Sequence, residues 1–281
     1  MIALDRVKDL KVLVMGDAIM DEYVYVEVVG KAAKESALSS VILRHDVFQG
    51  GVWAAAAHAR NFCARVDVLT GDRLMWNSRL VDDVYLRKLF VTHEERANDV
   101  APFACDAIES YDLVVVTDFG HGFMTRARIE EVTRKARYLA VNAQTNATNY
   151  GYNLITMYPR ADFVVLDHIE ARLAARDRES AIEDVILHLG LQNVIVTLGS
   201  EGAIGFDGAF ERREAETNLV LDTMGAGDAF LAVTAPFASV GASMKDLIAI
   251  GNAAGAAKIQ IVGHSASVNL ERLKDYLRET K

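Results

Sequence analysis

Short apolar runs alternate with helical segments over most of this 281-residue chain, and each run ends in a polar or glycine residue. Clear examples are residues 11–15, 113–117, 163–166 and 193–197. Runs of this length between turn residues are typical of buried parallel strands. Regular strand–helix alternation predicts an α/β fold, with helices packed on both faces of a largely parallel sheet.

Two segments depart from this alternation. Residues 22–47 are rich in β-branched and aromatic side chains, and residues 84–100 form a second candidate of the same kind. Strand-forming residues without intervening helices predict a small, separate β-sheet. We interpret the chain as one domain over 1–281, with this small sheet as a lid.

Composition excludes several classes of protein. The net charge is −9, which disfavours nucleic acid as the main partner. No window approaches the ~18 uninterrupted apolar residues of a membrane span, and the charged N-terminal residues lack an apolar signal core. Cys63 and Cys105 lack metal or redox spacing. We therefore expect a cytoplasmic protein with reduced thiols that does not bind membranes.

Polar or glycine residues follow the predicted strands at one common position, where each strand ends. They are Asp17, Asp118, Asn142, Asp167 and Gly199. In open α/β sheets, ligands bind beyond the carboxyl ends of the strands. The sequence therefore predicts a ligand site at this edge of the sheet.

The segment Asp222-Thr-Met-Gly-Ala-Gly-Asp228 precedes an apolar run that reads as a helix. Backbone N–H groups of Gly225, Ala226 and Gly227 would converge at the positive end of that helix, where an anion fits. Asp228 beside such an anion suits a base that deprotonates a hydroxyl attacking a phosphoryl group. The alternative is a glycine-rich turn whose aspartate only caps the helix.

This segment resembles the D-T-x-G-A-G-D signature of the ribokinase-like (PfkB) carbohydrate kinases, and the resemblance covers nearly the whole chain. It implies a ribokinase-like three-layer α/β/α sandwich with a small β-sheet lid, ATP and Mg²⁺ as cofactors, and a sugar acceptor. The implied roles of Gly225, Ala226, Gly227 and Asp228 are those of an anion hole and a catalytic base.

On the acceptor side, Asp17 and Asp21 suit hydrogen bonds to sugar hydroxyls, and the family holds its acceptor with an acidic residue here. Either aspartate could instead cap a turn. Gly50-Gly51 resembles the family's di-glycine signature, where bare glycines let a substrate approach the backbone. The Asn that commonly follows is absent, since the next one is Asn61.

On the nucleotide side, Thr197, Gly199 and Gly202 resemble the family's T-x-G-x-x-G turn. Asn252 lies in a segment of small residues that resembles the helix bordering adenine in the family. Alternatively, the small residues only allow two helices to pack closely. Asp167 and Glu170 stand where the family has N-x-x-E, which helps hold magnesium and the phosphates; a solvated helix start is the alternative. We expect Asn142 to face the nucleotide.

The middle of the chain, at 117–122 and 141–146, resembles the bacterial branch that phosphorylates heptose phosphates. That branch includes kinase modules fused to nucleotidyltransferases, so a nucleotidyltransferase partner on another chain is compatible with it. Lys31 or Lys34 in the lid would meet an acceptor phosphate; the alternative is that both are exposed lysines with no partner. We expect the lid's apolar face to form a homodimer. The alternatives are a kinase for a nucleoside or another small sugar, and a non-catalytic sugar or nucleotide sensor that retains the fold.

Overall fold

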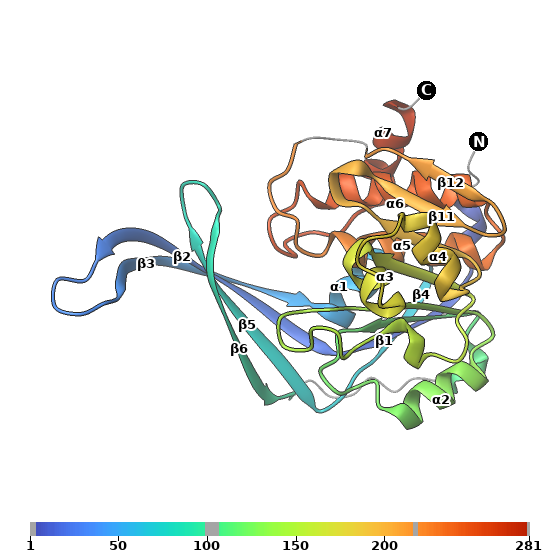
Figure 1. Ribbon diagram of the computed structural model, residues 1–281, viewed down its shortest axis with the longest axis horizontal. Helices are drawn as coiled ribbons and strands as arrows, with labels where there is room; N and C mark the ends of the chain where they lie inside the picture. The colour runs from blue at the N-terminus through green and yellow to red at the C-terminus, as the bar shows by residue number, and fades with distance from the viewer. Residues whose placement is uncertain (1–3, 99–106, 216–218, 280–281) are drawn as a thin grey trace.

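The computed structural model describes residues 4–98, 107–215 and 219–279. Within this part of the chain, eight strands form the main sheet (Figure 1). Their order across the sheet is β12 (Phe210–Arg213), β11 (Ala203–Phe206), β10 (Val194–Thr197), β9 (Phe163–Asp167), β8 (Leu139–Ala143), β7 (Leu113–Asp118), β1 (Lys11–Gly16) and β4 (Arg65–Leu69).

The strands from β10 to β4 run parallel to their neighbours, whereas β11 and β12 add an antiparallel edge. The carboxyl ends of the six parallel strands therefore meet at one edge of the sheet. The polar residues predicted to follow the strands are thus brought to the same side of the molecule.

Helices cover both faces of this sheet. One layer contains α1 (Gly51–Ala59), α5 (Ala226–Ser239), α6 (Met244–Lys258) and α7 (Leu270–Glu279), and the other contains α2 (Arg126–Lys135), α3 (His168–Ala175) and α4 (Ile182–Leu189). Short 3₁₀ turns occur at Leu4–Val7, Ile108–Ser110, Ile155–Met157 and Gly199–Glu201.

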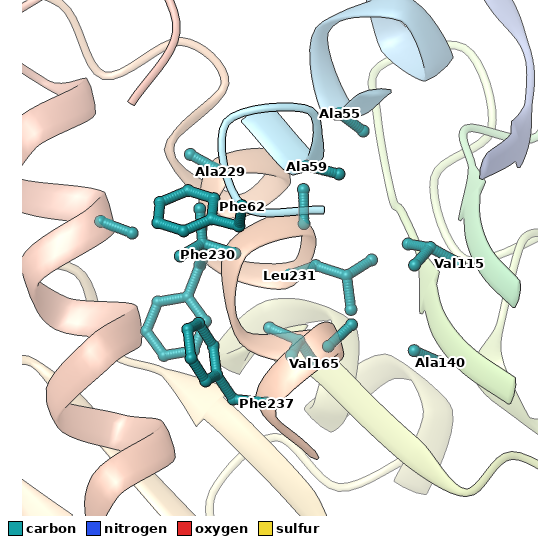
Figure 2. Packing of buried hydrophobic residues seen from close by; sticks show 14 of the residues in the cluster. Ala55, Ala59, Phe62, Val115, Ala140, Val165, Ala229, Phe230, Leu231 and Phe237 are labelled. Atoms are coloured by element: carbon teal, nitrogen blue, oxygen red, sulfur yellow. The ribbon is translucent and has the colours of Figure 1, made fainter. Parts of the chain in front are cut away.

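Side chains alternate between the two faces of the main sheet along each strand and so form two hydrophobic cores, one on each face. Val115 and Val165 pack with α1 and α5, while their chain neighbours Val114 and Val164 pack with α2, α3 and α4. Figure 2 shows Leu231 of α5 lying between the sheet and α1 in the first core. Successive side chains of a strand point to opposite faces, so fully apolar strands bury both. The predicted three-layer α/β/α sandwich is confirmed.

A second sheet has the order β3 (Leu38–Gly50), β2 (Ala18–Lys31), β5 (Arg73–Asp82) and β6 (Lys88–Ala97) in the described part of the chain. Its central pair, β2 and β5, is parallel, and both outer pairs are antiparallel. Figure 1 shows its two hairpins extending away from the main sheet. Both predicted lid segments contribute strands, except residues 99–100, which lie outside the described residues.

Strand β5 is missing from the sequence-based prediction. Its sequence, RLMWNSRLVD, places polar side chains at Asn77, Ser78 and Arg79, and the apolar alternation that marks a strand is lost. Two of these polar residues contact the candidate site, as described below, so the site explains the broken pattern.

The second sheet is joined directly to the functional edge of the first. Strand β2 begins two residues after β1 ends, and β3 runs into α1 without a loop. An isolated bridge between Ala18 and Gly51 ties the two connections together. The bases of β2 and β3 are therefore fixed beside the carboxyl ends of the parallel strands.

Two expectations from composition can be compared with the structure. Among the described residues, no helix combines the length and apolar character needed to cross a bilayer. Cys63 is buried and forms no disulfide, whereas Cys105 lies outside the described residues.

Candidate active site

The turn before α5 has the geometry of an anion site. Gly225 is the N-cap of α5, and its φ of +74° is readily adopted only by glycine. N–H groups in the first helical turn lack intrahelical acceptors and lie at the positive end of the helix dipole. A Cβ added at Gly227 would meet no atom within 4 Å, so open space lies beside this residue.

Asp228 lies in the same turn and is buried, with 7% of its surface exposed. The Gln144 side-chain amide donates a hydrogen bond of 2.6 Å to one of its carboxylate oxygens. Burial raises the pKa of Asp228 to about 6, the Asp21 carboxylate adds to the rise, and the Gln144 hydrogen bond opposes it. A carboxylate with a pKa near the working pH is well suited to general-base catalysis.

Two adjoining pockets meet at the start of α5. A polar one of about 220 Å³ contains Asp228, and a largely apolar one of about 360 Å³ contains Phe230. Both are lined by Thr197, Thr223, Ala226 and Gly227. A molecule with a flat apolar end and an anionic end would fit across the two.

The residues predicted for the nucleotide side line these pockets. The apolar pocket is bordered by Thr197, Gly199, Gly202 and Asn252, and its walls also include Val220 and Ile259. The polar pocket is bordered by Asn142, Asp167 and Glu170. The Asn252 amide donates to the Glu214 carbonyl at 2.7 Å. It thereby holds the segment that follows β12 against α6.

Asp167 and Glu170 form a capping box at the start of α3. Each side chain accepts a hydrogen bond from the other residue's backbone N–H, at 2.7 and 2.8 Å. Glu170 also accepts from the Asn142 amide and the Thr145 N–H. Burial, together with the neighbouring Asp167 carboxylate, raises the pKa of Glu170. Both carboxylates are thus held rigidly at the wall of the polar pocket.

Asp21, which the sequence predicts to bind the acceptor, lies near the base of β2 and is 3% exposed. One carboxylate oxygen of Asp21 accepts hydrogen bonds from Arg79 and Asn77 of β5. The other lies 3.6 Å from Nε2 of His264. A Cβ at Gly50 would lie 2.2 Å from that second oxygen, so glycine leaves the room that this carboxylate occupies.

Asp17, which the sequence predicts to bind acceptor hydroxyls, has three partners within the chain. Its carboxylate accepts three backbone N–H groups, from Phe119, His121 and Phe123, at 2.9 to 3.3 Å. These bonds hold the turn after β7 against the end of β1. At Gly51, with φ of +53°, a Cβ would lie 2.6 Å from the Asp17 carbonyl oxygen, so this glycine serves the same close packing.

Comparison with known proteins agrees with this arrangement. Residues 87–270 match the family model described as pfkB family carbohydrate kinase. The chain belongs to the pfkB family of carbohydrate kinases. The resemblance to this family seen in the sequence is therefore confirmed.

Individual relatives share limited sequence identity with this member of the pfkB family. It is 28% identical over 195 residues to the bifunctional protein HldE of Desulfatibacillum aliphaticivorans, a match covering 66% of this chain and 39% of that protein. It is 38% identical over 109 residues to fructoselysine 6-kinase of Shigella flexneri, covering 38% and 40%. The chain thus spans about two fifths of the curated relatives' length.

Among solved structures, ribokinase of Thermotoga maritima superposes with a TM-score of 0.69 at 16% identity. The superposition covers 96% of this chain and 99% of that one. At this identity the likeness concerns the fold, and it confirms the ribokinase-like architecture.

The pfkB family also implies Mg²⁺, and the site can be tested for it. The described residues contain no group of three or more His, Cys, Asp or Glu side chains able to hold a metal ion. Asp167 and Glu170 offer two carboxylates beside the polar pocket. Because Mg²⁺ keeps several waters and is bound through few carboxylates plus substrate phosphates, this donor set fits an ion carried by the nucleotide.

Lys34 lies away from the candidate site of its own chain. It is exposed, in the turn 32–37 that joins β2 to β3. Figure 1 shows that turn at the end of the hairpin remote from the main sheet. The expected contact between Lys34 and an acceptor phosphate has no support from the contacts in this chain.

Sequence reasoning missed several residues that lie at the candidate site. They are Asn77, Arg79, Gln144, Lys258 and His264. Apart from Lys258, which also bonds to nearby Ile261 and Gly263, each is brought in by an element distant in sequence from its partner. One available signal was Lys258, a charged residue directly after the small apolar run 253–257 of α6.

Proposed function

We propose that this protein transfers the γ-phosphoryl group of ATP to a hydroxyl of a sugar or sugar phosphate, with Asp228 as the base. One observation carries the proposal. Asp228 is buried, has a pKa raised to about 6, and lies at the helix N-terminus where the polar pocket meets the acceptor side. The Asp21 carboxylate adds to this rise in pKa through space.

The chemical step is an in-line displacement. The acceptor oxygen forms a bond to the γ-phosphorus while the bond to the leaving ADP oxygen breaks, and the hydroxyl proton passes to the Asp228 carboxylate. N–H groups of Gly225, Ala226 and Gly227 are proposed to bind the phosphoryl oxygens, whose charge they would stabilise in a site already built for it.

ATP is proposed to lie across the two adjoining pockets. The apolar pocket, with Phe230, Val220 and Ile259 in its walls, suits the adenine base. The polar pocket suits the phosphates. Asp167 and Glu170 would hold Mg²⁺ through water, and the ion would neutralise phosphate charge.

The acceptor is proposed to bind against Asp21, between β2, β5 and the loop carrying His264. A carboxylate fixed by Arg79 and Asn77 can accept hydrogen bonds from sugar hydroxyls. Relatives named HldE and fructoselysine 6-kinase support a sugar-derived acceptor. The resemblance to modules fused to nucleotidyltransferases suggests such a partner on another chain. Asp17 is left with a structural role in this proposal.

We also propose a homodimer formed through the second sheet, which would serve as a lid. Exposed apolar side chains gather on it, including Val29, Ile42, Val47 and Phe90. A sheet with an uncovered apolar face is stabilised by pairing with another such face. The lid would exclude water, which would otherwise compete with the acceptor.

Two alternatives lead to different experimental results. A kinase for a nucleoside or another small sugar would release ADP with those acceptors only. A non-catalytic sensor would bind ligands without turnover, although the intact Asp228 opposes that function. ADP release should therefore be measured with a panel of sugars, sugar phosphates, fructoselysine and nucleosides.

The base is tested by Asp228→Asn, which keeps the size of the side chain and removes its proton affinity. We expect kcat to fall at least ~100-fold, the scale of lost general-base catalysis, while ATP binding is retained. The control is Asp207→Asn, in the exposed turn between β11 and β12, which should keep normal turnover. Near-native kcat in Asp228→Asn would remove this residue from the mechanism.

A further inference from the structure

Lys258, the last residue of α6, is completely buried, with 0% of its surface exposed. Its ammonium donates to three main-chain carbonyls, those of Met224 at 2.7 Å, Gly263 at 2.8 Å and Ile261 at 3.4 Å. A lysine ammonium has three protons to donate. All three are thus directed at backbone oxygen atoms.

Within the described part of the chain, no carboxylate contacts Lys258 to cancel its charge. Two other cations near the site each form an ion pair, Arg79 with Asp21 and Lys88 with Asp222. The acceptors described for Lys258 are neutral, and Asp222 and Asp228 act on it only through space. Burial lowers its pKa to about 8, which reflects the free-energy cost of a buried charge. A binding partner with negative charge would offset that cost.

The ammonium is placed directly behind the anion hole. The Met224 carbonyl that it holds belongs to the same peptide unit as the Gly225 N–H, and this unit is trans. In a trans peptide the N–H points away from the carbonyl. Gly225 lines the polar pocket and packs on the lysine, since an added Cβ would lie 3.3 Å from Lys258 Cε.

We propose that Lys258 is a positioning residue that acts as a built-in monovalent cation for the phosphate site. Its ammonium fixes the orientation of the Met224–Gly225 peptide, polarises it, and adds a positive charge behind the anion hole. The three carbonyls form a ligand set that a free monovalent cation could otherwise occupy. This inference deepens the proposed function, on which it rests for the identity of the anion as the phosphates of ATP.

The first experiment measures binding, so it needs no knowledge of the acceptor. ATP and adenosine affinities are compared in Lys258→Met, which keeps the length of the side chain and removes its charge. ATP should bind about 10- to 100-fold more weakly, the scale for losing a charged hydrogen-bonding group. Adenosine, which lacks phosphates, should bind as before. Lys245→Met, at the exposed start of the same helix, is the matched control and should change neither affinity.

The second experiment is chemical rescue of Lys258→Ala, which leaves the carbonyls in place around a space. Ammonium or potassium chloride should restore ATP binding, and Lys258→Met should show no rescue because its side chain fills the space. Tetramethylammonium chloride at equal ionic strength is the control, since that ion is too large to enter.

The experimental outcomes distinguish the role proposed for Lys258 from the proposed kinase function on which it rests. Equal loss of ATP and adenosine affinity, or Lys258→Ala binding that responds alike to ammonium and tetramethylammonium, would assign Lys258 to folding only and overturn the proposal. If Lys258→Met does not fold, rescue of Lys258→Ala decides the question. Failure of every acceptor in the ADP-release panel would count against the proposed function without altering these binding results.

Discussion

At the scale of single residues, the environment of Asp228 determines what it can do. Burial favours its protonated form, and the neighbouring Asp21 carboxylate acts in the same direction. The Gln144 amide stabilises the ionised form through its hydrogen bond and so acts in the opposite direction. The balance leaves a carboxylate that is ionised, and able to accept a proton, at neutral pH.

This balance predicts the pH dependence of the reaction. Above a pKa of about 6, Asp228 is ionised and can accept the proton, whereas below it the base is already protonated. We expect kcat to fall on the acid side with this apparent pKa. Gln144→Met removes a bond that stabilises the ionised form, so the acid limb should move to higher pH. The measurement is kcat from about pH 5 to pH 9, a range that spans the base's titration.

Two results would count against this prediction. An acid limb at the ordinary pKa of an exposed aspartate would mean that another step or group controls the rate. An unchanged limb in Gln144→Met would mean that the hydrogen bond does not tune the base.

At the scale of secondary structure, the junction between β3 and α1 positions the acceptor side. Gly50 has a φ of −102°, which alanine adopts easily, so its importance is spatial rather than conformational. An added methyl group would meet the Asp21 carboxylate at 2.2 Å. The strand and the helix therefore meet at a residue that must have no side chain.

Gly50→Ala is accordingly expected to displace Asp21 and raise the KM for the acceptor about 10-fold or more, the effect of a lost charged hydrogen bond. The KM for ATP should stay unchanged, because the nucleotide pockets lie on other elements. Gly190→Ala is the control. With φ of +64° and open space around it, this substitution should cost roughly 1–2 kcal/mol of stability and leave both KM values alone. A parallel rise of both KM values in Gly50→Ala would contradict the assignment.

Features encoded locally are the ones that the sequence predicted. Apolar runs located the parallel strands, and the segment Asp222–Asp228 located the anion site at the start of α5. The missed features depend on contacts between distant segments. Strand β5 has a polar stretch that is explained by Asp21 and Glu22 on the neighbouring strand β2. The three backbone partners of Asp17 lie more than 100 residues away. No local pattern distinguishes those roles.

At the scale of the whole molecule, the second sheet leaves apolar side chains uncovered. Ile42 on β3 is 58% exposed, and similar residues continue along both hairpins. Figure 1 shows these hairpins standing clear of the helical layers, so the helices of the same chain leave them uncovered. The proposed homodimer follows from this exposure.

Ile42→Asp should therefore weaken self-association by placing a charge in the proposed interface, where desolvation makes it costly. Sedimentation velocity over a series of concentrations would measure the dimer fraction. Leu187→Asp on α4 is the control, since that side chain is 53% exposed and lies outside the second sheet. A wild-type protein that stays monomeric at every concentration would refute the dimer.

Apart from His264, the residues of the proposed acceptor side come from a different stretch of the chain than the nucleotide pockets. Asp21, Gly50, Asn77 and Arg79 all precede residue 87, where the match to the family model begins, and the nucleotide pockets lie within the matched part. Mutations in one stretch of the gene can thus alter acceptor choice while the phosphoryl-donor machinery is inherited unchanged. Such a division lets natural selection diversify sugar specificity without rebuilding the reaction.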